Sequence, residues 1–485
     1  MLAIRHHGVA ASEQDLAQQL AVLSQAIPLD VVLEVAAAHA HPTQRRRKLP
    51  LPTLLLLVVT MSIFTQDALE VVFVRLCAGL RDHWPDAAAG LATRSALCRG
   101  RQRLGLRPVI ALFHRIARPL ATPATPGGFL WGMRLVALDG TKDVVPDSPA
   151  NAHAFGRSAS QHGAAAYPQV LGIYLVEVGT RLVLDATFWP CATTEHTGAR
   201  RLLRSVQRGA LLLADAGFYS ALLVTRVRAT GAHLLGCLPA GVLLRDPVAL
   251  PDGSVWAFVQ GTDQHQQPLR VRVRVITYRL TDPARPHAGE TRRLVTTLLD
   301  AERYPALDLI LAYHERWEVE LAISELGTRQ RLAADPLRSQ TPLGVLQELY
   351  GLLLAHYALR TVVVQAAALA GVDPDRISFT RTIQLVAAAL PIFQVTPRRQ
   401  HARLYARLLA DIGRSLLPPR ATRSNPRVVK RQQSKFPRKR PQHLGTPPLQ
   451  LAFRDAFVLL PGVPAARAVA PLDPTFAFPA PLPAR

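Results

Sequence analysis

The chain has 485 residues, and its 57 Lys and Arg residues against 34 Asp and Glu residues give a formal net charge of +23. Because 49% of the residues are hydrophobic, a chain that is disordered throughout is excluded, and the length corresponds to roughly two to four domains. The excess of positive charge indicates a polyanionic partner, with nucleic acid preferred over an anionic membrane.

The cysteines and one apolar segment bear on the compartment. None of the four cysteines forms a C-x-x-C pair, so a zinc ribbon and a disulfide framework are excluded and a reducing cytoplasm is expected. Residues 49–64 are apolar but contain Pro50 and Pro52, and a spanning helix needs about 20 apolar residues. We therefore predict a buried core helix there and no membrane association. Residues 1–10 also lack the apolar region of a signal peptide.

Residues 1–125 are predicted to form a helical domain that binds DNA. Apolar residues recur there at steps of three and four, which is the period of an amphipathic helix. A basic helix is expected over 93–104, where Arg99 and Arg101 are candidate DNA contacts, and a solvated helix face is the alternative. A linker containing two prolines and two glycines follows at 121–128.

Residues 126–239 are predicted to form the first part of a catalytic core, because short apolar strands bounded by turn residues replace the helical period. The strands are expected at 134–138, 170–178, 182–188, 210–214 and 233–238, with helices at 194–207 and 221–229. The order of three strands, a helix, a strand, a helix and a strand is that of a ribonuclease-H-like core. The predicted fold class is therefore α/β with a mixed sheet.

A strand-rich insertion is predicted over residues 240–300, where valines at 271, 273 and 275 alternate with arginines at 272 and 274 to give a basic face. Helical periodicity then returns. Residues 301–340 are expected to carry a core helix with a third carboxylate, and residues 341–418 to form a helical carboxyl-terminal region.

Residues 419–485 are predicted to be a flexible tail, first basic and then rich in proline. No acidic residue occurs between Asp411 and Asp455, whereas arginine and lysine are frequent there. Such a segment contacts phosphates without sequence specificity, and increased solubility alone is the other interpretation. The candidate phosphate contacts are Lys430, Arg431, Arg438 and Lys439.

Two aspartates follow predicted strands directly. Asp139 comes after 135–138 and precedes Gly140, and Asp215 comes after 211–214. Open α/β sheets place their ligand chemistry at the carboxyl ends of strands. For either residue alone a simple turn is the competing interpretation, but two such aspartates in one sheet favour a site.

A third carboxylate is expected on a helix over residues 307–326. At 100° per residue, Tyr313, Arg316 and Glu320 fall within about 60° of one another, and Glu320 borders the buried stripe. Three other glutamates of this helix are expected to be solvated, namely Glu315, Glu318 and Glu325.

These three carboxylates fit one kind of chemistry. An enzyme that cuts phosphodiesters needs carboxylates that converge on hard divalent cations such as Mg²⁺. Two such ions stabilise both the attacking and the leaving oxygens of an in-line displacement. Asp139, Asp215 and Glu320 are the set that this architecture brings together.

Three tracts resemble a known family. Residues 136–157 closely resemble the first catalytic block of transposases of the insertion element four family, and residues 211–219 resemble the second. Residues 313–320 are similar to the family's signature: tyrosine, two residues, arginine, three residues, glutamate, six residues, lysine. The resemblance spans residues 15–440 and departs from the signature at Gly327, which replaces the lysine.

The resemblance implies a DDE transposase with a ribonuclease-H-like core, a β insertion and two Mg²⁺ or Mn²⁺ ions. Such enzymes cut terminal inverted repeats, through a 3′-hydroxyl and a hairpin intermediate, and join the ends to target DNA. They do so as a homodimer in a synaptic complex, here expected on the bacterial nucleoid. By position, Asp139 bridges both ions, Asp215 and Glu320 complete the metal site, and Tyr313 and Arg316 hold phosphate near the scissile bond.

Other interpretations stay open at this stage. A ribonuclease-H-like nuclease would hydrolyse DNA without joining it, and a decayed copy would only bind DNA. Gly327 keeps the second of these open. If the helix continues past it, Arg331 lies on the face of Tyr313 and replaces the missing lysine as a phosphate contact, whereas Arg329 competes for that role if the helix breaks.

Overall fold

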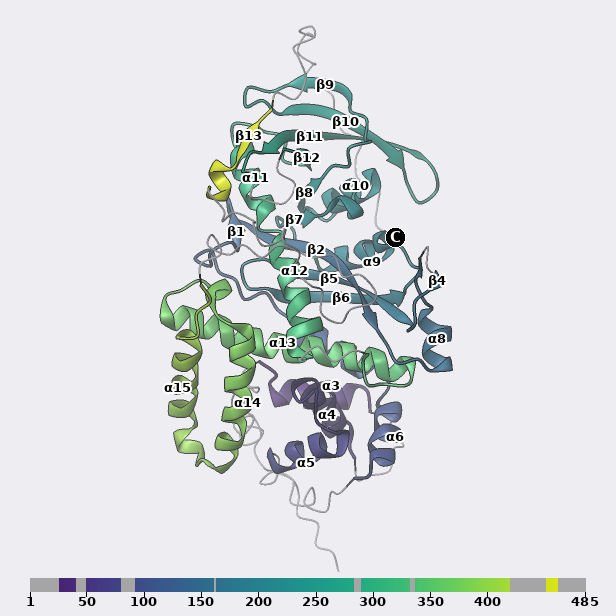
Figure 1. Cartoon of the computed structure of the whole chain (residues 1–485), viewed down its shortest axis with the longest axis vertical. Helices are drawn as coiled ribbons and strands as arrows, with labels where there is room; N and C mark the ends of the chain where they lie inside the picture. Colours follow the sequence, from purple (N-terminus) through teal and green to yellow (C-terminus); the bar gives the residue numbers. More distant parts are fainter. Residues whose placement is uncertain are drawn as a thin grey trace, which may run out of the picture.

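The structure is a computed structural model, and it describes residues 26–40, 49–79, 92–160, 163–282, 289–331, 336–418 and 451–460. Figure 1 shows three tiers along the longest axis: helices of the amino-terminal region at one end, a sheet in the middle, and the strands of the insertion at the other end.

The central sheet carries the predicted core. Its strands are β2 (Met133–Val144), β5 (Gln169–Glu177), β6 (Leu182–Pro190), β7 (Leu211–Ala214) and β8 (His233–Cys237). They lie in the order β6-β5-β2-β7-β8, in which β6, β5 and β2 are antiparallel and β2, β7 and β8 are parallel. This confirms the predicted α/β class with a mixed sheet, in which the five predicted strands all form.

Each face of the sheet is covered by helices. Because side chains alternate between the two faces of a strand, each strand contributes to the core on either side. Val136 and Leu138 pack into the core shared with α9 (Glu195–Leu202) and α10 (Ala221–Ala229), whereas Ala137 points to the opposite core. That second core is shared with α12 (Trp317–Ser324), which follows α11 (Ala306–His314). The strands are apolar on both faces, and this accounts for the continuous hydrophobic runs in the sequence.

The insertion continues the central sheet. It comprises β9 (Arg245–Ala249), β10 (Val255–Thr262), β11 (Pro268–Leu280) and β12 (Thr291–Thr296), and β12 pairs antiparallel with β8. The alternation in β11 gives a basic face only in part. Arg274 is fully buried, where it donates a hydrogen bond to Ser254 and pairs with Asp252.

The amino-terminal helices are α3 (Leu29–Ala38), α4 (Leu51–Ile63), α5 (Leu69–Gly79), α6 (Arg94–Leu104) and α7 (Arg107–Ile116). Helix α4 has a proline in its first turn, where a missing N–H costs no hydrogen bond, and most of its side chains are buried. This confirms the prediction of a buried core helix in the apolar segment 49–64.

Helix α13 (Pro342–Ala370) lies between the sheet and the amino-terminal helices (Figure 1). By length and composition it is the one helix in the described ranges that is long and apolar enough to cross a membrane. However, 78% of its most apolar window is buried inside the protein, as expected for a core helix. A Gly at its carboxyl end, Gly371, adopts φ +64° and terminates it.

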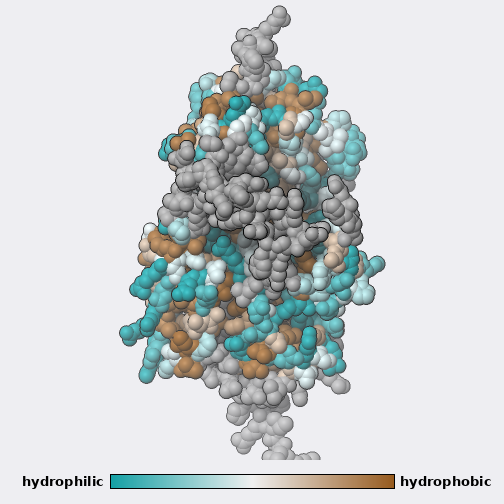
Figure 2. Space-filling model, viewed as in Figure 1, coloured by the Kyte–Doolittle hydropathy of each residue, from teal (hydrophilic) through white to brown (hydrophobic). Residues whose placement is uncertain are grey.

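Two further helices, α14 (Phe379–Val395) and α15 (His401–Gly413), form a pair that packs on the end of α13. Figure 2 shows hydrophobic and hydrophilic side chains mixed on the visible surface of this pair. The smaller elements are β1 (Phe129–Leu130), α8 (Pro149–Phe155), β3 (Ala159–Ser160), β4 (Gly163–Ala164) and the π-helix η4 (Glu325–Gln330).

One stretch of the predicted flexible tail is ordered structure. The strand β13 (Phe457–Leu459) pairs antiparallel with β11, and Phe457 packs edge-on against Tyr278 with ring centroids 5.8 Å apart. Phe453 stacks on His314 at the end of α11, with ring centroids 3.8 Å apart. The prediction of a flexible tail is therefore wrong for residues 451–460, because this segment pairs with β11 and its aromatic side chains pack on Tyr278 and His314. The basic residues between 419 and 450 lie outside the described ranges.

Candidate active site

The two aspartates lie side by side where the parallel pairing of β2 with β7 ends. Asp215 directly follows the last residue of β7, but β2 does not end at residue 138 as predicted: it runs on to Val144 because residues 139–144 continue to pair with β5, so Asp139 lies within the strand. Leu138 of β2 pairs with Ala214 of β7, so the next residue of each chain segment, Asp139 and Asp215, reaches the same edge. Each carboxylate accepts a 2.7 Å hydrogen bond from the following backbone N–H, that of Gly140 or Ala216. These local bonds fix the direction of both side chains.

The third carboxylate comes from a helix that is interrupted at the site. The predicted single helix over 307–326 ends at His314 and restarts at Trp317 as α12. Arg316 lies in this break, donates a 3.1 Å hydrogen bond to Glu320 and lies 3.8 Å from Asp139 Oδ2. Tyr313 donates a 3.4 Å hydrogen bond to the carbonyl of Ala214, directly before Asp215. The structure therefore brings all five predicted residues of this group together.

The electrostatics of the group follow from partial burial. Burial raises the pKa of Asp139 to about 6, helped by the nearby Glu320 and Asp215, although the Gly140 N–H and Arg316 act against this rise. Burial alone would lower the pKa of Arg316, but Tyr313 and the three carboxylates outweigh it and raise the pKa. The Arg316 side chain is 9% exposed, so it is a buried cation held by the surrounding carboxylates.

The oxygen atoms of Asp139, Asp215 and Glu320 are the candidate ligands for a divalent cation. Carboxylate oxygens from a rigid sheet and a short helix are the hard ligands that Mg²⁺ and Mn²⁺ take, and Arg316 shows that a positive group is held among them. Within the described ranges, no three His, Cys, Asp or Glu side chains stand close enough together to hold an ion as they are. The donor chemistry fits, and Arg316 fills the space between Asp139 and Glu320.

Two glutamates that were expected to be solvated are buried instead. Glu318 is 3% exposed and Glu325 is 1% exposed. Arg181 pairs with both, through a 2.5 Å bond to Glu318 and a 3.2 Å bond to Glu325, and Arg360 of α13 also pairs with Glu325. Burial would raise the pKa of Glu325, but Arg360, His356 and Arg181 hold it well below its usual range. This network anchors the helix that carries the third carboxylate.

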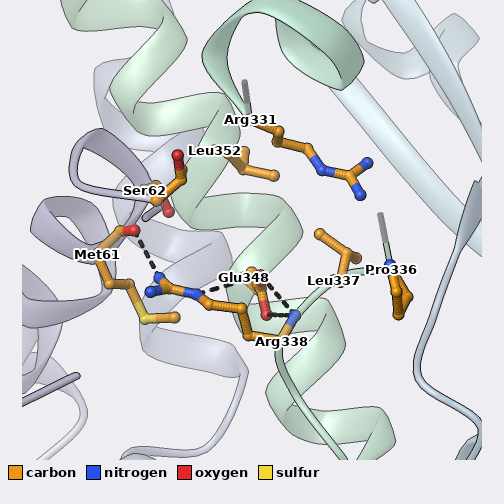
Figure 3. A pocket seen from close by; sticks show the side chains of 9 residues that line it. Met61, Ser62, Arg331, Pro336, Leu337, Arg338, Glu348 and Leu352 are labelled. Carbon is orange, nitrogen blue, oxygen red and sulfur yellow. Dashed lines mark hydrogen bonds and ion pairs between the residues drawn. The ribbon is translucent and has the colours of Figure 1, made fainter. Parts of the chain in front are cut away.

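The helix beyond Gly327 does not follow the predicted geometry. Residues Glu325–Gln330 form a π-helix, so an angle of 100° per residue no longer applies. Arg331 consequently turns inward: it is 4% exposed and bonds to Asp143 at 3.0 Å. Figure 3 shows Arg331 on the wall of a small pocket whose other side holds Arg338, paired with Glu348. The expected placement of Arg331 on the face of Tyr313 is therefore wrong.

The two arginines of the predicted basic helix differ in position. Arg99 is exposed on α6. Arg101 is 9% exposed, and its guanidinium donates hydrogen bonds to Gln347, Ser339 and the carbonyl of Gly344. Arg101 therefore joins α6 to α13 and is not available to DNA in this arrangement. Lys430, Arg431, Arg438 and Lys439 lie outside the described residues.

One acidic residue near the site was not predicted. Glu195, the first residue of α9, lies against the two glycines that follow the aspartates. Its Oε1 and Oε2 lie 3.3 Å and 3.5 Å from where a Cβ would stand on Gly140 and Gly217. Nothing in the local sequence distinguishes it from an ordinary acidic residue at a helix start.

The chain matches two family profiles and two relatives. The profile described as "Transposase DDE domain" matches residues 130–358, and the one described as "Insertion element 4 transposase N-terminal" matches residues 17–114. The chain is 30% identical over 384 residues to "Transposase InsG for insertion sequence element IS4" of Escherichia coli (strain K12), covering 78% of this chain and 85% of that relative. It is 29% identical over 156 residues to "Putative transposase InsZ" of the same strain, covering 32% and 52%.

Among solved structures, the chain aligns with the "Cryo-EM structure of piggyBac transposase synaptic complex with hairpin DNA" over 81% of this chain and 85% of that chain, at 9% sequence identity. The TM-score is 0.41, which is too low to support an argument. The matched domain and the relative over most of the chain define the class of protein as a DDE transposase, an enzyme of DNA recombination. Within that class, the chain belongs to the insertion element 4 family.

Proposed function

We propose that this transposase cleaves the terminal inverted repeats of its own insertion sequence and joins the ends to target DNA by two-metal-ion phosphoryl transfer, acting on the bacterial nucleoid. The observation that supports this most directly is the meeting of Asp139, Asp215 and Glu320 around one buried cation, Arg316. Carboxylates that hold cations suit phosphoryl transfer, because the cations stabilise the negative charge that develops on the phosphate.

Each residue of the group has a defined task in this proposal. Asp139, Asp215 and Glu320 would hold two Mg²⁺ or Mn²⁺ ions, which activate the attacking oxygen and stabilise the leaving one when bound. Arg316 donates N–H groups to the non-bridging oxygens of the scissile phosphate, for which the planar guanidinium is well suited. Burial raises the pKa of Tyr313 well above its usual range, so its phenol stays protonated. The phenol donates a hydrogen bond to the carbonyl of Ala214 and thereby positions the backbone directly before Asp215.

DNA binding outside the site requires cations that reach solvent. Arg99 on α6 is exposed and fits this role, whereas the buried Arg101 instead fixes the helix in place. The basic residues Lys430, Arg431, Arg438 and Lys439 are proposed to neutralise phosphates without reading sequence. We further propose a homodimer in which two such chains hold the two ends of the element.

Replacement of Asp139 tests the catalytic proposal. Asp139→Asn removes a carboxylate charge from the centre of the group, so cleavage of duplex DNA carrying a terminal repeat should fall by two orders of magnitude or more. Binding of the same duplex, measured by gel shift, should persist within about twofold, and the exposed Glu302→Gln should behave as wild type. Cleavage near the wild-type rate by Asp139→Asn would contradict the assignment.

The same assay separates the proposed function from its alternatives. A transposase converts a cut repeat end and a target plasmid into a joined product, which is resolved on a gel. A nuclease yields cut ends without the joined product, and a decayed copy binds the duplex but yields neither. Wild-type protein that never forms the joined product with Mg²⁺ or Mn²⁺ would reject the transposition chemistry for this chain.

A further inference from the structure

Arg316 lies among the carboxylates that are proposed to hold the two metal ions. Its guanidinium is 3.1 Å from Glu320 and 3.8 Å from Asp139, and the charge of Asp215 also acts on it. It is therefore the cation shared by all three carboxylates of the proposed metal site. A single positive side chain thus stands among the carboxylates that would hold the two divalent ions, and it neutralises one of their three negative charges.

Arg316 lies close to the surface as well as to the carboxylates. Arg316 belongs to the tight turn between α11 and α12, where its backbone N–H donates to the carbonyl of Tyr313 and its carbonyl accepts from the N–H of Val319. Its guanidinium lies 5.9 Å from the ring of Tyr313 and 5.8 Å from that of Trp317, so it packs between two aromatic faces. Trp317 is 36% exposed, which places one side of this packing at the surface. The guanidinium therefore lies beside carboxylates that are themselves 22% and 31% exposed, in Asp139 and Glu320, and next to an aromatic side chain that reaches solvent, so a phosphate of bound DNA can approach it.

Charge balance sets a condition on loading the site. The three carboxylates carry three negative charges, and Arg316 already neutralises one of them, so two divalent ions would leave this partly buried group with an excess of positive charge beside the buried guanidinium. A buried excess charge is costly. A phosphate of bound DNA removes this excess and also offers the guanidinium a bidentate anion.

We infer that Arg316 couples DNA binding to metal binding, acting as a built-in cation that competes with the metal ions until a DNA phosphate draws it away from Asp139 and Glu320. This inference rests on the proposed function. By linkage, DNA must then tighten metal binding by the same factor as metal tightens DNA binding. Arg316 thus has a role before the chemical step, in addition to holding the phosphate during it.

The test measures Mn²⁺ binding to the full-length protein by the loss of the electron paramagnetic resonance signal of free Mn²⁺. The titration is done without DNA and with a duplex that ends in an already cut terminal repeat, so that no cleavage takes place. For the wild type, we expect the duplex to lower the Kd for Mn²⁺ by about tenfold, within the 5- to 150-fold range usual for such coupling. Arg316→Met should bind Mn²⁺ about tenfold more tightly than wild type without DNA and respond to the duplex by less than twofold.

Two further variants serve as controls. Arg316→Lys keeps the charge near the carboxylates and should stay weak without DNA, and the exposed Arg303→Met should match the wild type in both titrations. Should Arg316→Met fail to fold, the wild-type comparison decides alone, because an unchanged Kd with the duplex would refute the coupling. Arg316→Met that binds Mn²⁺ as weakly as wild type, or more weakly, would also refute it. Failure of the proposed function is a different result, in which Asp139→Asn and Asp215→Asn bind Mn²⁺ as wild type does.

Discussion

Replacement of Glu325 by glutamine is the most informative perturbation of the scaffold beneath the site. Glu325 is 1% exposed and accepts hydrogen bonds from Arg181, Arg360 and His356. Glutamine keeps the volume of the side chain but removes its charge. Arg181 retains Glu318 at 2.5 Å, whereas Arg360, which is fully buried, is left with no carboxylate among its described ion-pair partners.

The size of the effect follows from that stranded charge. Removing one partner of a buried ion pair costs about 3–5 kcal/mol, because the other charge stays buried without compensation. We expect Glu325→Gln to lower the free energy of unfolding by this amount in urea titrations followed by circular dichroism. The double variant Glu325→Gln/Arg360→Met removes the stranded charge as well and should be less destabilised than the single one. This reversal separates charge burial from a loss of packing.

The matched control is the same substitution at an exposed glutamate. Glu302 is exposed, and Glu302→Gln should change the free energy of unfolding by no more than about 0.5 kcal/mol. A loss below about 1 kcal/mol for Glu325→Gln, or a double variant less stable than the single one, would refute the view that the buried network holds α12 in place.

Two further predictions concern acid stability and the missing lysine. Burial would raise the pKa of Asp185, but hydrogen bonds from His114, Arg204 and Ser205 outweigh it and lower the pKa to about 2. Since the unfolded value is about 3.9, the stabilisation is present above pH 4 and is lost as the pH falls from about 4 to about 2. Asp185→Asn should flatten the decline of the urea midpoint over that interval, and an identical decline would count against this. Gly327 has open space around its Cβ position, so Gly327→Lys should raise the rate of strand cleavage and Arg329→Ala should lower it. No change in either variant would show that this segment does not touch the scissile strand.

The sequence by itself determined the central sheet and its two aspartates. A buried strand shows in the sequence as a short apolar run, and the polar residue that ends the run marks where its buried part ends. For Asp215 this is also the end of the strand, whereas β2 runs on past Asp139 to Val144, which the local sequence did not show. Asp139 and Asp215 could therefore be placed near each other from the order of residues alone, whereas the adjacency of β2 and β7 came from the structure. The spacing of Tyr313, Arg316 and Glu320 also sufficed, because the break between α11 and α12 is too short to separate them.

Only the tertiary structure decided which charged residues are buried. Arg101, Glu318, Glu325 and Arg331 have the sequence pattern of surface residues, and each is buried because a partner far along the chain satisfies it. Arg101 meets Gln347 across 246 positions, Arg331 meets Asp143 across 188, and Arg181 meets Glu318 across 137. The π-helix over Glu325–Gln330 was likewise not predicted, and its first residue, Glu325, is bound to Arg181, Arg360 and His356. A charge can be buried only where its counter-charge is brought to it, and that pairing is a property of the fold, which no local window of sequence contains.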